Sequence, residues 1–251
     1  MSADALEVRY LTGEDEAFVT TLLDARADVI AHGGPVRRFA WYQGMAHYPG
    51  WWWSATMHDH VGYESLLERD RLMLADFDRD TVAIASQPFG LSGQLDGAAC
   101  RHVPDYLLLR RDGSVLVVDV KPGRLLDTPE VASVLAWTGH HLALKGWRYE
   151  IWSGADTALL TNVRFIAQGR RDDRVNSKAV HALWRHGEAG MTLHEAIESA
   201  LRVSEVERRE VQASMLTLLW RQEWIVDLSA PLAGTTVIEA VEVGADARRS
   251  A

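Results

Sequence analysis

The pattern of apolar and polar positions along the chain predicts a mixed α/β protein. Apolar residues alternate weakly over 6–10, as in a strand, and recur at helical spacing over 15–30, which predicts a helix. The aromatic stretch 33–60 has no regular period, and we expect it to be irregular. An amphipathic helix is predicted over 63–76, and a strand over 82–89 that ends at a glycine.

The strongest local signal is a β-hairpin between residues 105 and 121. Two apolar runs flank Asp112-Gly113 there, and an Asp-Gly pair between such runs is typical of a tight turn. Pro122-Gly123 stops the second strand, because proline cannot donate a hydrogen bond to a sheet. A helix over 129–144 and a strand over 149–152 follow. This order of helix, three strands, helix and strand predicts an α/β or α+β layer with a mixed sheet and flanking helices.

The polar, highly charged run 168–176 predicts a boundary between a domain over 1–168 and a second domain over 169–251. Three helices and then two β-prone runs are predicted in the second domain, over 177–185, 192–201, 206–220, 224–228 and 235–241. Three helices closed by a β-ribbon are the pattern of a winged-helix domain.

Composition narrows the class of protein. The chain has 251 residues, of which 47% are hydrophobic and 24% charged, as in an ordinary soluble protein. It has no run of about 18 apolar residues, and its acidic start lacks the basic and apolar regions of a signal peptide. We therefore expect a protein that neither spans a membrane nor is exported. Cys100 is the single cysteine, which excludes a disulfide framework or a cysteine-based zinc site and favours the reducing cytoplasm.

The charge balance limits how the chain could hold nucleic acid. The formal net charge is −9, whereas non-specific affinity for nucleic acid comes from neutralising phosphates. A DNA enzyme with this balance would depend on partners. The chain has only three lysines, Lys121, Lys145 and Lys178, so a lysine in a particular place is informative, since ammonium and guanidinium groups do different chemistry.

One lysine belongs to the most informative group of residues, which lies on the predicted hairpin. Asp119 and Lys121 are two apart on one strand, so their side chains project from the same face about 6.6 Å apart. If Gly113 forms a left-handed bulge, Arg110 pairs with Ser114, and Asp105 then lies opposite Asp119. With a two-residue loop, Asp105 lies opposite Val120 instead. We favour the first register because it gathers the three polar groups.

Two neighbouring carboxylates in an apolar sheet indicate a cation between them. Oxygen ligands suit Mg²⁺, with Mn²⁺ as a substitute, and the carbonyl of Val120 is a further candidate ligand. Lys121 beside the metal could orient or deprotonate a water and stabilise a phosphorane-like transition state. An ion pair at the end of a strand is the plainer interpretation of Asp119 and Lys121. The preceding Pro104-Asp105, the hairpin and an upstream acidic helix favour the catalytic one.

These residues resemble the PD-(D/E)xK nucleases, and among them the TnsA-type endonuclease subunit of heteromeric cut-and-paste transposases. The resemblance covers about 60 residues closely and most of the chain loosely. It runs through Tyr63–Asp70, Ala85–Phe89, Val103–Tyr106, Asp112-Gly113 and Val118–Pro122. It implies a restriction-endonuclease-like fold followed by a winged-helix domain.

The resemblance also implies roles for individual residues. A helix of the family supplies a catalytic glutamate that falls by position on Glu68, which joins Asp105, Asp119 and Lys121 as a catalytic residue. Some relatives carry glutamine where this chain has Asp119. Glu64 is four residues from Glu68 and is expected on the same helix face, so either could reach the metal. Gln87 could touch the site or the DNA, or could be a polar residue at a strand edge.

The resemblance implies a Mg²⁺-dependent DNA endonuclease that cleaves the 5′ ends of a mobile element. Its expected partners are double-stranded DNA at the transposon ends, an integrase-fold transposase that cuts the 3′ ends, and an AAA+ ATPase regulator, and it would associate with the nucleoid when bound to DNA. A stand-alone nuclease in defence or repair and an inactive winged-helix adaptor are the alternatives. We expect the acidic second domain to contact a partner protein through Trp184, Trp220 and Trp224.

Overall fold

The chain forms two compact units that divide between Gly154 and Ala155. The structure, a computed structural model, describes residues 6–14, 16–37, 48–171, 173 and 175–242. The division lies earlier than the predicted boundary at Gln168, because the segment around Gly169 packs in the second unit. A Cβ on Gly169 would lie 2.4 Å from the backbone nitrogen of Thr217, so the two backbones are in direct contact.

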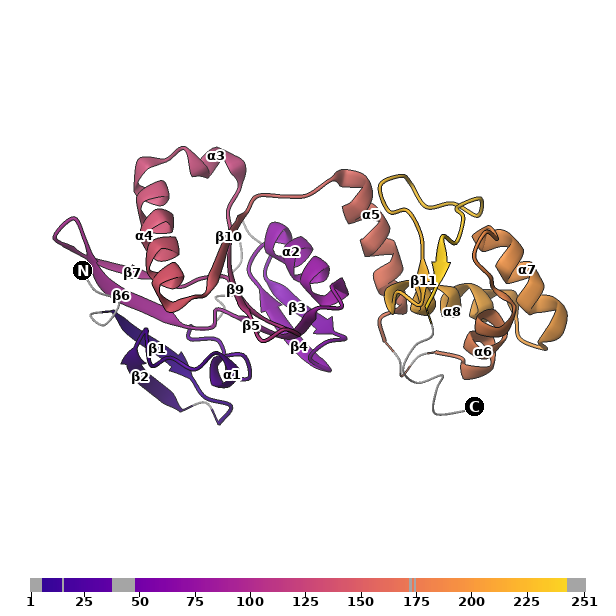
Figure 1. Cartoon of the computed structure of the whole chain (residues 1–251), viewed down its shortest axis with the longest axis horizontal. Coiled ribbons are helices and arrows are strands. Elements are labelled where there is room, and N and C mark those ends of the chain that lie inside the picture. The colour runs from indigo at the N-terminus through magenta and orange to yellow at the C-terminus, as the bar shows by residue number, and fades with distance from the viewer. Residues whose placement is uncertain (1–5, 15, 38–47, 172, 174, 243–251) are drawn as a thin grey trace. The chain divides into compact units, whose positions relative to one another are not determined.

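The described residues of the first unit form two four-stranded sheets, a separate hairpin and four helices (Figure 1). The first sheet is antiparallel, with the order β2 (Ala17–Thr21), β1 (Glu7–Leu11), β6 (Gly90–Leu95) and β7 (Ala98–His102). The second sheet is mixed, with the order β10 (Arg148–Trp152), β9 (Val115–Val120), β8 (Tyr106–Arg110) and β5 (Thr81–Ser86), and only β10 and β9 are parallel. The hairpin and helices are β3 (Gly50–Ser54), β4 (Asp59–Tyr63), α1 (Ala27–Ile30), α2 (Leu66–Phe77), α3 (Gly123–Leu126) and α4 (Pro129–Lys145).

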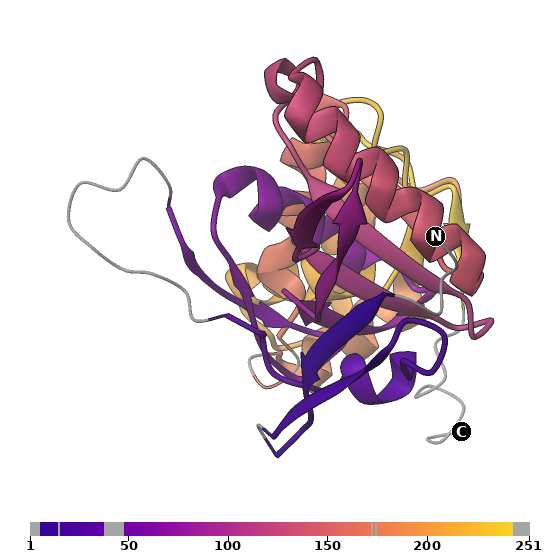
Figure 2. The same cartoon turned by 90° about the vertical axis from the view of Figure 1, so that its left-hand side faces the viewer.

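The predicted order of helix, three strands, helix and strand is confirmed. It corresponds to α2, β5, β8, β9, α4 and β10, with the β6–β7 hairpin, which the sequence pattern did not reveal, inserted between β5 and β8. Helix α4 contacts β6, β7 and β10, and α2 contacts β5 and β9 (Figures 1 and 2). The unit is therefore an α/β assembly in which the hairpin β8–β9 occupies the middle of the mixed sheet.

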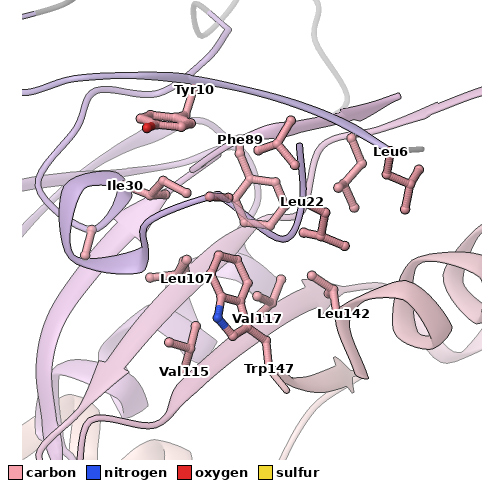
Figure 3. Packing of buried hydrophobic residues seen from close by; sticks show 14 of the residues in the cluster. Leu6, Tyr10, Leu22, Ile30, Phe89, Leu107, Val115, Val117, Leu142 and Trp147 are labelled. Carbon is pink, nitrogen blue, oxygen red and sulfur yellow. The ribbon is translucent and has the colours of Figure 1, made fainter. Parts of the chain in front are cut away.

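The main core lies between the two sheets and α4. It is built from alternate residues of strands in both sheets, such as Val8 and Leu91 in the first and Leu107 and Val117 in the second. Figure 3 shows Phe89 in this core with Leu107 and Val117, and the indole of Trp147 near Val117. The centroids of the Phe89 and Trp147 rings lie 5.8 Å apart. Apolar burial of this extent, at about 25 cal/mol per Å², holds the two sheets against each other.

Two predictions of secondary structure in the first unit are wrong. Residues 17–21 form strand β2 instead of part of a helix over 15–30, because the run Ala-Phe-Val-Thr-Thr is β-prone and pairs with β1 along its whole length. Only α1 is helical there. The stretch 33–60 is not irregular throughout, since β3 and β4 pair as a hairpin from Gly50 to Tyr63.

The hairpin β8–β9 adopts the first of the two predicted registers. The Arg110 amide donates to the Ser114 carbonyl over 2.9 Å, and Gly113 has φ +80° in the turn. The strand pairing ends at Tyr106 and Val118, and the Asp105 amide then donates to the carbonyl of Val118. Asp105 thus stands at the mouth of the hairpin, beside the last residues of β9.

The second unit consists of helices followed by a short β-ribbon, and all three predicted helices are confirmed. Thr192 and Glu195 form the predicted capping box at the start of α7. Two of the three tryptophans expected at a partner interface, Trp220 and Trp224, are instead buried and stabilise the unit's core. Trp184 is half-buried. The elements are α5 (Thr157–Ile166), η2 (Ala167–Gly169), α6 (Ser177–His186), α7 (Leu193–Val203), α8 (Arg208–Trp220), β11 (Trp224–Ile225) and β12 (Ala240–Val241).

Candidate metal and catalytic centre

Asp105, Asp119 and Lys121 come together at the end of β9, as the sequence predicts. The Lys121 Nζ lies 2.9 Å from Asp105 Oδ2 and 3.3 Å from Asp119 Oδ1. It also donates to the carbonyl of Val120 over 3.2 Å. The carboxylates are almost fully buried, with exposed fractions of 7% for Asp105 and 0% for Asp119. Burial of two carboxylates at one ammonium group makes this a concentrated charged site inside an apolar sheet.

Two further residues, which the sequence did not single out, hold the Asp119 carboxylate. Its Oδ2 lies 2.8 Å from His102 Nε2 and accepts a 2.5 Å hydrogen bond from the Tyr149 hydroxyl. Because both partners contact Oδ2, the other carboxylate oxygen, Oδ1, faces Lys121. His102 belongs to β7 of the other sheet, and no local pattern could have linked it to Asp119. Tyr149 is the second residue of β10, which pairs in parallel with β9, and the predicted mixed sheet could have placed it nearby.

Glu68 lies near this cluster but does not bond to it. Its carboxylate accepts hydrogen bonds from the Glu64 amide, 2.8 Å, and the Ser65 hydroxyl, 2.9 Å, at the start of α2. Burial raises the pKa of Glu68 to about 7, and the nearby charge of Asp105 adds to this effect. The Glu68 carboxylate therefore interacts electrostatically with Asp105 and also takes part in the N-terminal cap of α2.

Glu64 is not on the same helix face as Glu68, which corrects a sequence prediction. Ser65 is the N-cap of α2, so Glu64 precedes the helix and the four-residue spacing does not align the two side chains. The Glu64 carboxylate instead forms an ion pair with Arg37. Of the two glutamates, Glu68 is the one coupled to the cluster.

Gln87 adjoins Asp105 and is an unusual residue. Its backbone amide donates to the Asp105 carbonyl over 2.8 Å, and its φ of +46° is in the left-handed region that few non-glycine residues adopt. The side chain is 3% exposed, and neither amide atom has a hydrogen-bond partner within the part of the chain that the structure describes. Unpaired buried polar groups are costly and are concentrated at functional sites.

The pKa shifts show how the cluster distributes charge. Burial raises the pKa of Asp105, and the ammonium of Lys121 only partly opposes this. Burial acts in the same direction on Asp119, but the hydrogen bond and charge of His102, with Lys121 and Tyr149, lower the pKa of Asp119 overall. Burial acts to lower the pKa of Lys121, yet the two carboxylates raise it. Asp105 is thus the carboxylate whose ionised form would gain most from an added cation.

The donor set fits a hard divalent cation. Oxygens of Asp105, Asp119 and Val120 converge on one cationic group, the Lys121 ammonium, and carboxylate and carbonyl oxygens are the ligands that Mg²⁺ and Mn²⁺ prefer. Among the described residues, no group of three or more histidine, cysteine, aspartate and glutamate side chains is arranged to hold a metal. The Val120 carbonyl is the third protein oxygen that contacts Lys121, whereas the Glu68 carboxylate is bonded to Glu64 and Ser65.

Comparisons with known proteins add no family to this picture. No protein-family model matches the sequence, and no curated protein matches it. No helix in the described part of the chain is long and apolar enough to cross a membrane. The case for a function therefore comes from the residues of the site and from the sequence motifs.

Proposed function

We propose that this chain is a Mg²⁺-dependent DNA endonuclease, the subunit of a heteromeric transposase that cleaves the 5′ ends of a mobile element. The observation that carries the proposal is the convergence of Asp105, Asp119 and the Val120 carbonyl on the Lys121 ammonium at the mouth of a buried hairpin. A structural ion pair needs one carboxylate, whereas two buried carboxylates face this ammonium group. His102 balances the charge of Asp119 only when its imidazole is protonated.

The chain's own residues divide the work of phosphodiester hydrolysis. Asp105 and Asp119, with the Val120 carbonyl, would hold Mg²⁺, which polarises the phosphodiester and activates water when bound. His102 and Tyr149 fix the Asp119 carboxylate so that its other oxygen faces the site. Lys121, released from the carboxylates, would orient the attacking water or stabilise charge on the phosphate. Glu68, with its pKa near 7, is placed to exchange a proton at neutral pH.

The fold supports this assignment. The helix α2, the strands β5, β8 and β9, and then α4 and β10 follow the order expected of a restriction-endonuclease-like domain. The second unit's three helices α6, α7 and α8 and its β-ribbon support a winged-helix domain. We assign the second unit to contacts with the integrase-fold transposase or the AAA+ ATPase regulator, because the net charge of −9 favours recruitment to DNA by partners. In this role the protein would work in the cytoplasm, at the nucleoid when bound to DNA.

A nicking assay tests the proposal. Supercoiled plasmid is incubated with the chain and Mn²⁺ or Mg²⁺, alone and with the transposase partner, and nicked circles are measured. Asp105→Asn and Asp119→Asn keep the shape of the side chains and should abolish nicking. Asp80→Asn is the matched control, because Asp80 is an exposed carboxylate beside Arg110 and Arg111 at the other end of the hairpin, and it should nick like the wild type.

The outcomes separate the alternatives. Metal-dependent nicking that both active-site variants lose supports a nuclease, and a requirement for the transposase supports the subunit role. Strong nicking without any partner would favour a stand-alone nuclease. Absence of nicking by the wild type under all of these conditions would favour the inactive adaptor.

A further inference from the structure

A small cavity lies at the first sheet, where β6 begins and β7 ends. Its volume is about 250 Å³, and its charged lining residues are Glu7, Arg9, Arg37 and Arg101. Three guanidinium groups thus stand against one carboxylate, in a chain whose formal net charge is −9. A local excess of arginine in an acidic protein indicates a site for an anion.

The strand register explains why the arginines gather there. Arg9 of β1 pairs with Gly90 of β6, and Arg101 of β7 pairs with Ser92 of β6. Residues two apart on a strand, and residues directly opposite on paired strands, project from the same face. Arg9 and Arg101 therefore share one face of the sheet on either side of β6, and Gly90 leaves the space next to Arg9 free of a side chain.

The three arginines of the cavity differ in whether a carboxylate already neutralises their charge. Arg37 forms an ion pair with Glu64. Arg9 and Arg101 are exposed, and neither has a carboxylate partner among the residues that the structure describes. A guanidinium group offers paired donors in a plane that matches two oxygens of a phosphate. Two unneutralised guanidinium groups on one face are suited to a phosphate group.

The cavity adjoins the candidate metal centre through two chains of direct contacts. His102 lines the cavity, and its Nε2 lies 2.8 Å from Asp119 Oδ2. Val36 also lines it, and the Val36 amide donates to the Gln87 carbonyl over 3.0 Å. The Gln87 amide in turn donates to the Asp105 carbonyl. One residue therefore separates the cavity from Asp119, and two separate it from Asp105.

We infer that this cavity binds a backbone phosphate of duplex DNA next to the phosphodiester that the metal centre cleaves. The inference rests on the proposed nuclease function and extends it with a second contact to the same DNA. A phosphate held by Arg9 and Arg101 would fix the register of the strand at the Asp105–Asp119–Lys121 cluster. It would also give this acidic chain a local means of holding DNA once a partner has delivered it.

The salt dependence of DNA binding tests the inference. The dissociation constant for a duplex of about 30 base pairs is measured between about 50 and 200 mM NaCl, with Ca²⁺ in place of Mg²⁺. Each lost phosphate contact lowers the slope of log affinity against log salt by about 1. The variant Arg9→Gln/Arg101→Gln should therefore lower it by about 2 and weaken binding at low salt.

A control variant removes two arginine charges at a different cavity. Arg111 and Arg148 are exposed and line a different cavity, with Asp80 and Asp112, at the other end of the second sheet. The variant Arg111→Gln/Arg148→Gln should keep the wild-type slope. Thermal unfolding of both variants shows that the fold is retained.

Three results would overturn the inference. If the wild type binds the duplex and Arg9→Gln/Arg101→Gln keeps its slope, the cavity makes no DNA contact, while the nuclease proposal stands. If inorganic phosphate stabilises the wild type but not that variant, and both bind DNA equally, the cavity takes free anions. If the wild type neither binds nor nicks DNA, both the inference and the proposed function are wrong.

Discussion

Replacing Glu68 by glutamine should make the chain more stable at high pH when no divalent metal is present. The pKa of Glu68 is raised from 4.5 to about 7, first by burial and then by Asp105. The folded state therefore binds the Glu68 proton more tightly than the unfolded state does. This contribution to stability is complete below about pH 4.5 and is lost as the pH rises through about 7.

The size of the effect follows from the shift. A displacement of about 2.5 pKa units, at about 1.36 kcal/mol per unit, amounts to about 3 kcal/mol of lost stability above pH 7. Glu68→Gln keeps a hydrogen-bonding group for the Glu64 amide and the Ser65 hydroxyl but cannot ionise. The wild type should therefore lose up to about 3 kcal/mol relative to Glu68→Gln between pH 5 and pH 8.

Urea unfolding in EDTA, followed by tryptophan fluorescence at several pH values, measures this difference. Glu195→Gln is a suitable control, because Glu195 has the same position in the cap of α7. Hydrogen bonds from Thr192 lower the pKa of Glu195, so Glu195 stays ionised from pH 5 to pH 8. The difference in unfolding free energy between the wild type and Glu195→Gln should therefore be constant over this range. Addition of Mn²⁺ should reduce the pH dependence at Glu68, since a nearby cation favours the carboxylate. A wild-type-to-Glu68→Gln difference that does not change with pH would refute the reasoning.

Three further changes have defined expectations. Lys121→Ala should slow DNA nicking by roughly 10²- to 10⁴-fold, the usual contribution of a positioned proton-transfer or charge-stabilising group. Lys121→Arg should not restore the full rate, because a guanidinium group does not exchange protons near neutral pH. Tyr149→Phe removes the 2.5 Å hydrogen bond to Asp119 and should weaken Mn²⁺ binding by about 10- to 100-fold in calorimetry; unchanged affinity would show that Tyr149 does not position Asp119. Gly169→Ala places a Cβ 2.4 Å from the backbone of Thr217 and should lower the free energy of unfolding by about 1 to 3 kcal/mol. If Gly169→Ala is as stable as the wild type, this backbone contact is not close.

The parts of the site that the sequence predicted are those governed by local rules. The Asp-Gly turn determines the register of β8 and β9, and the two-residue period of a strand then brings Asp119 and Lys121 to one face. Their meeting with Asp105 needed no information from outside the hairpin. The amphipathic helix α2 was predictable for the same reason, although its N-cap at Ser65 separated Glu64 from Glu68.

The parts that the sequence missed depend on contacts between distant segments. His102 reaches Asp119 only because the β6–β7 hairpin of one sheet packs against the other sheet. The charged run near Gln168 resembled a linker, but its Gly169 is packed against α8. Strand β2 was missed for a different reason, because helical spacing at Phe18 and Leu22 concealed a β-prone run that forms a hairpin with the neighbouring β1.

Binding of Mn²⁺ to crystals of the protein is the sharpest test of a metal site at Asp105 and Asp119. We expect an anomalous scattering peak within bonding distance, about 2.0 to 2.2 Å, of carboxylate oxygens from both Asp105 and Asp119. We also expect that the Lys121 ammonium no longer lies between those carboxylates when the metal is bound. Crystals at saturating Mn²⁺ without a peak shared by Asp105 and Asp119, and with Lys121 still bridging them, would show that these residues do not form a metal site.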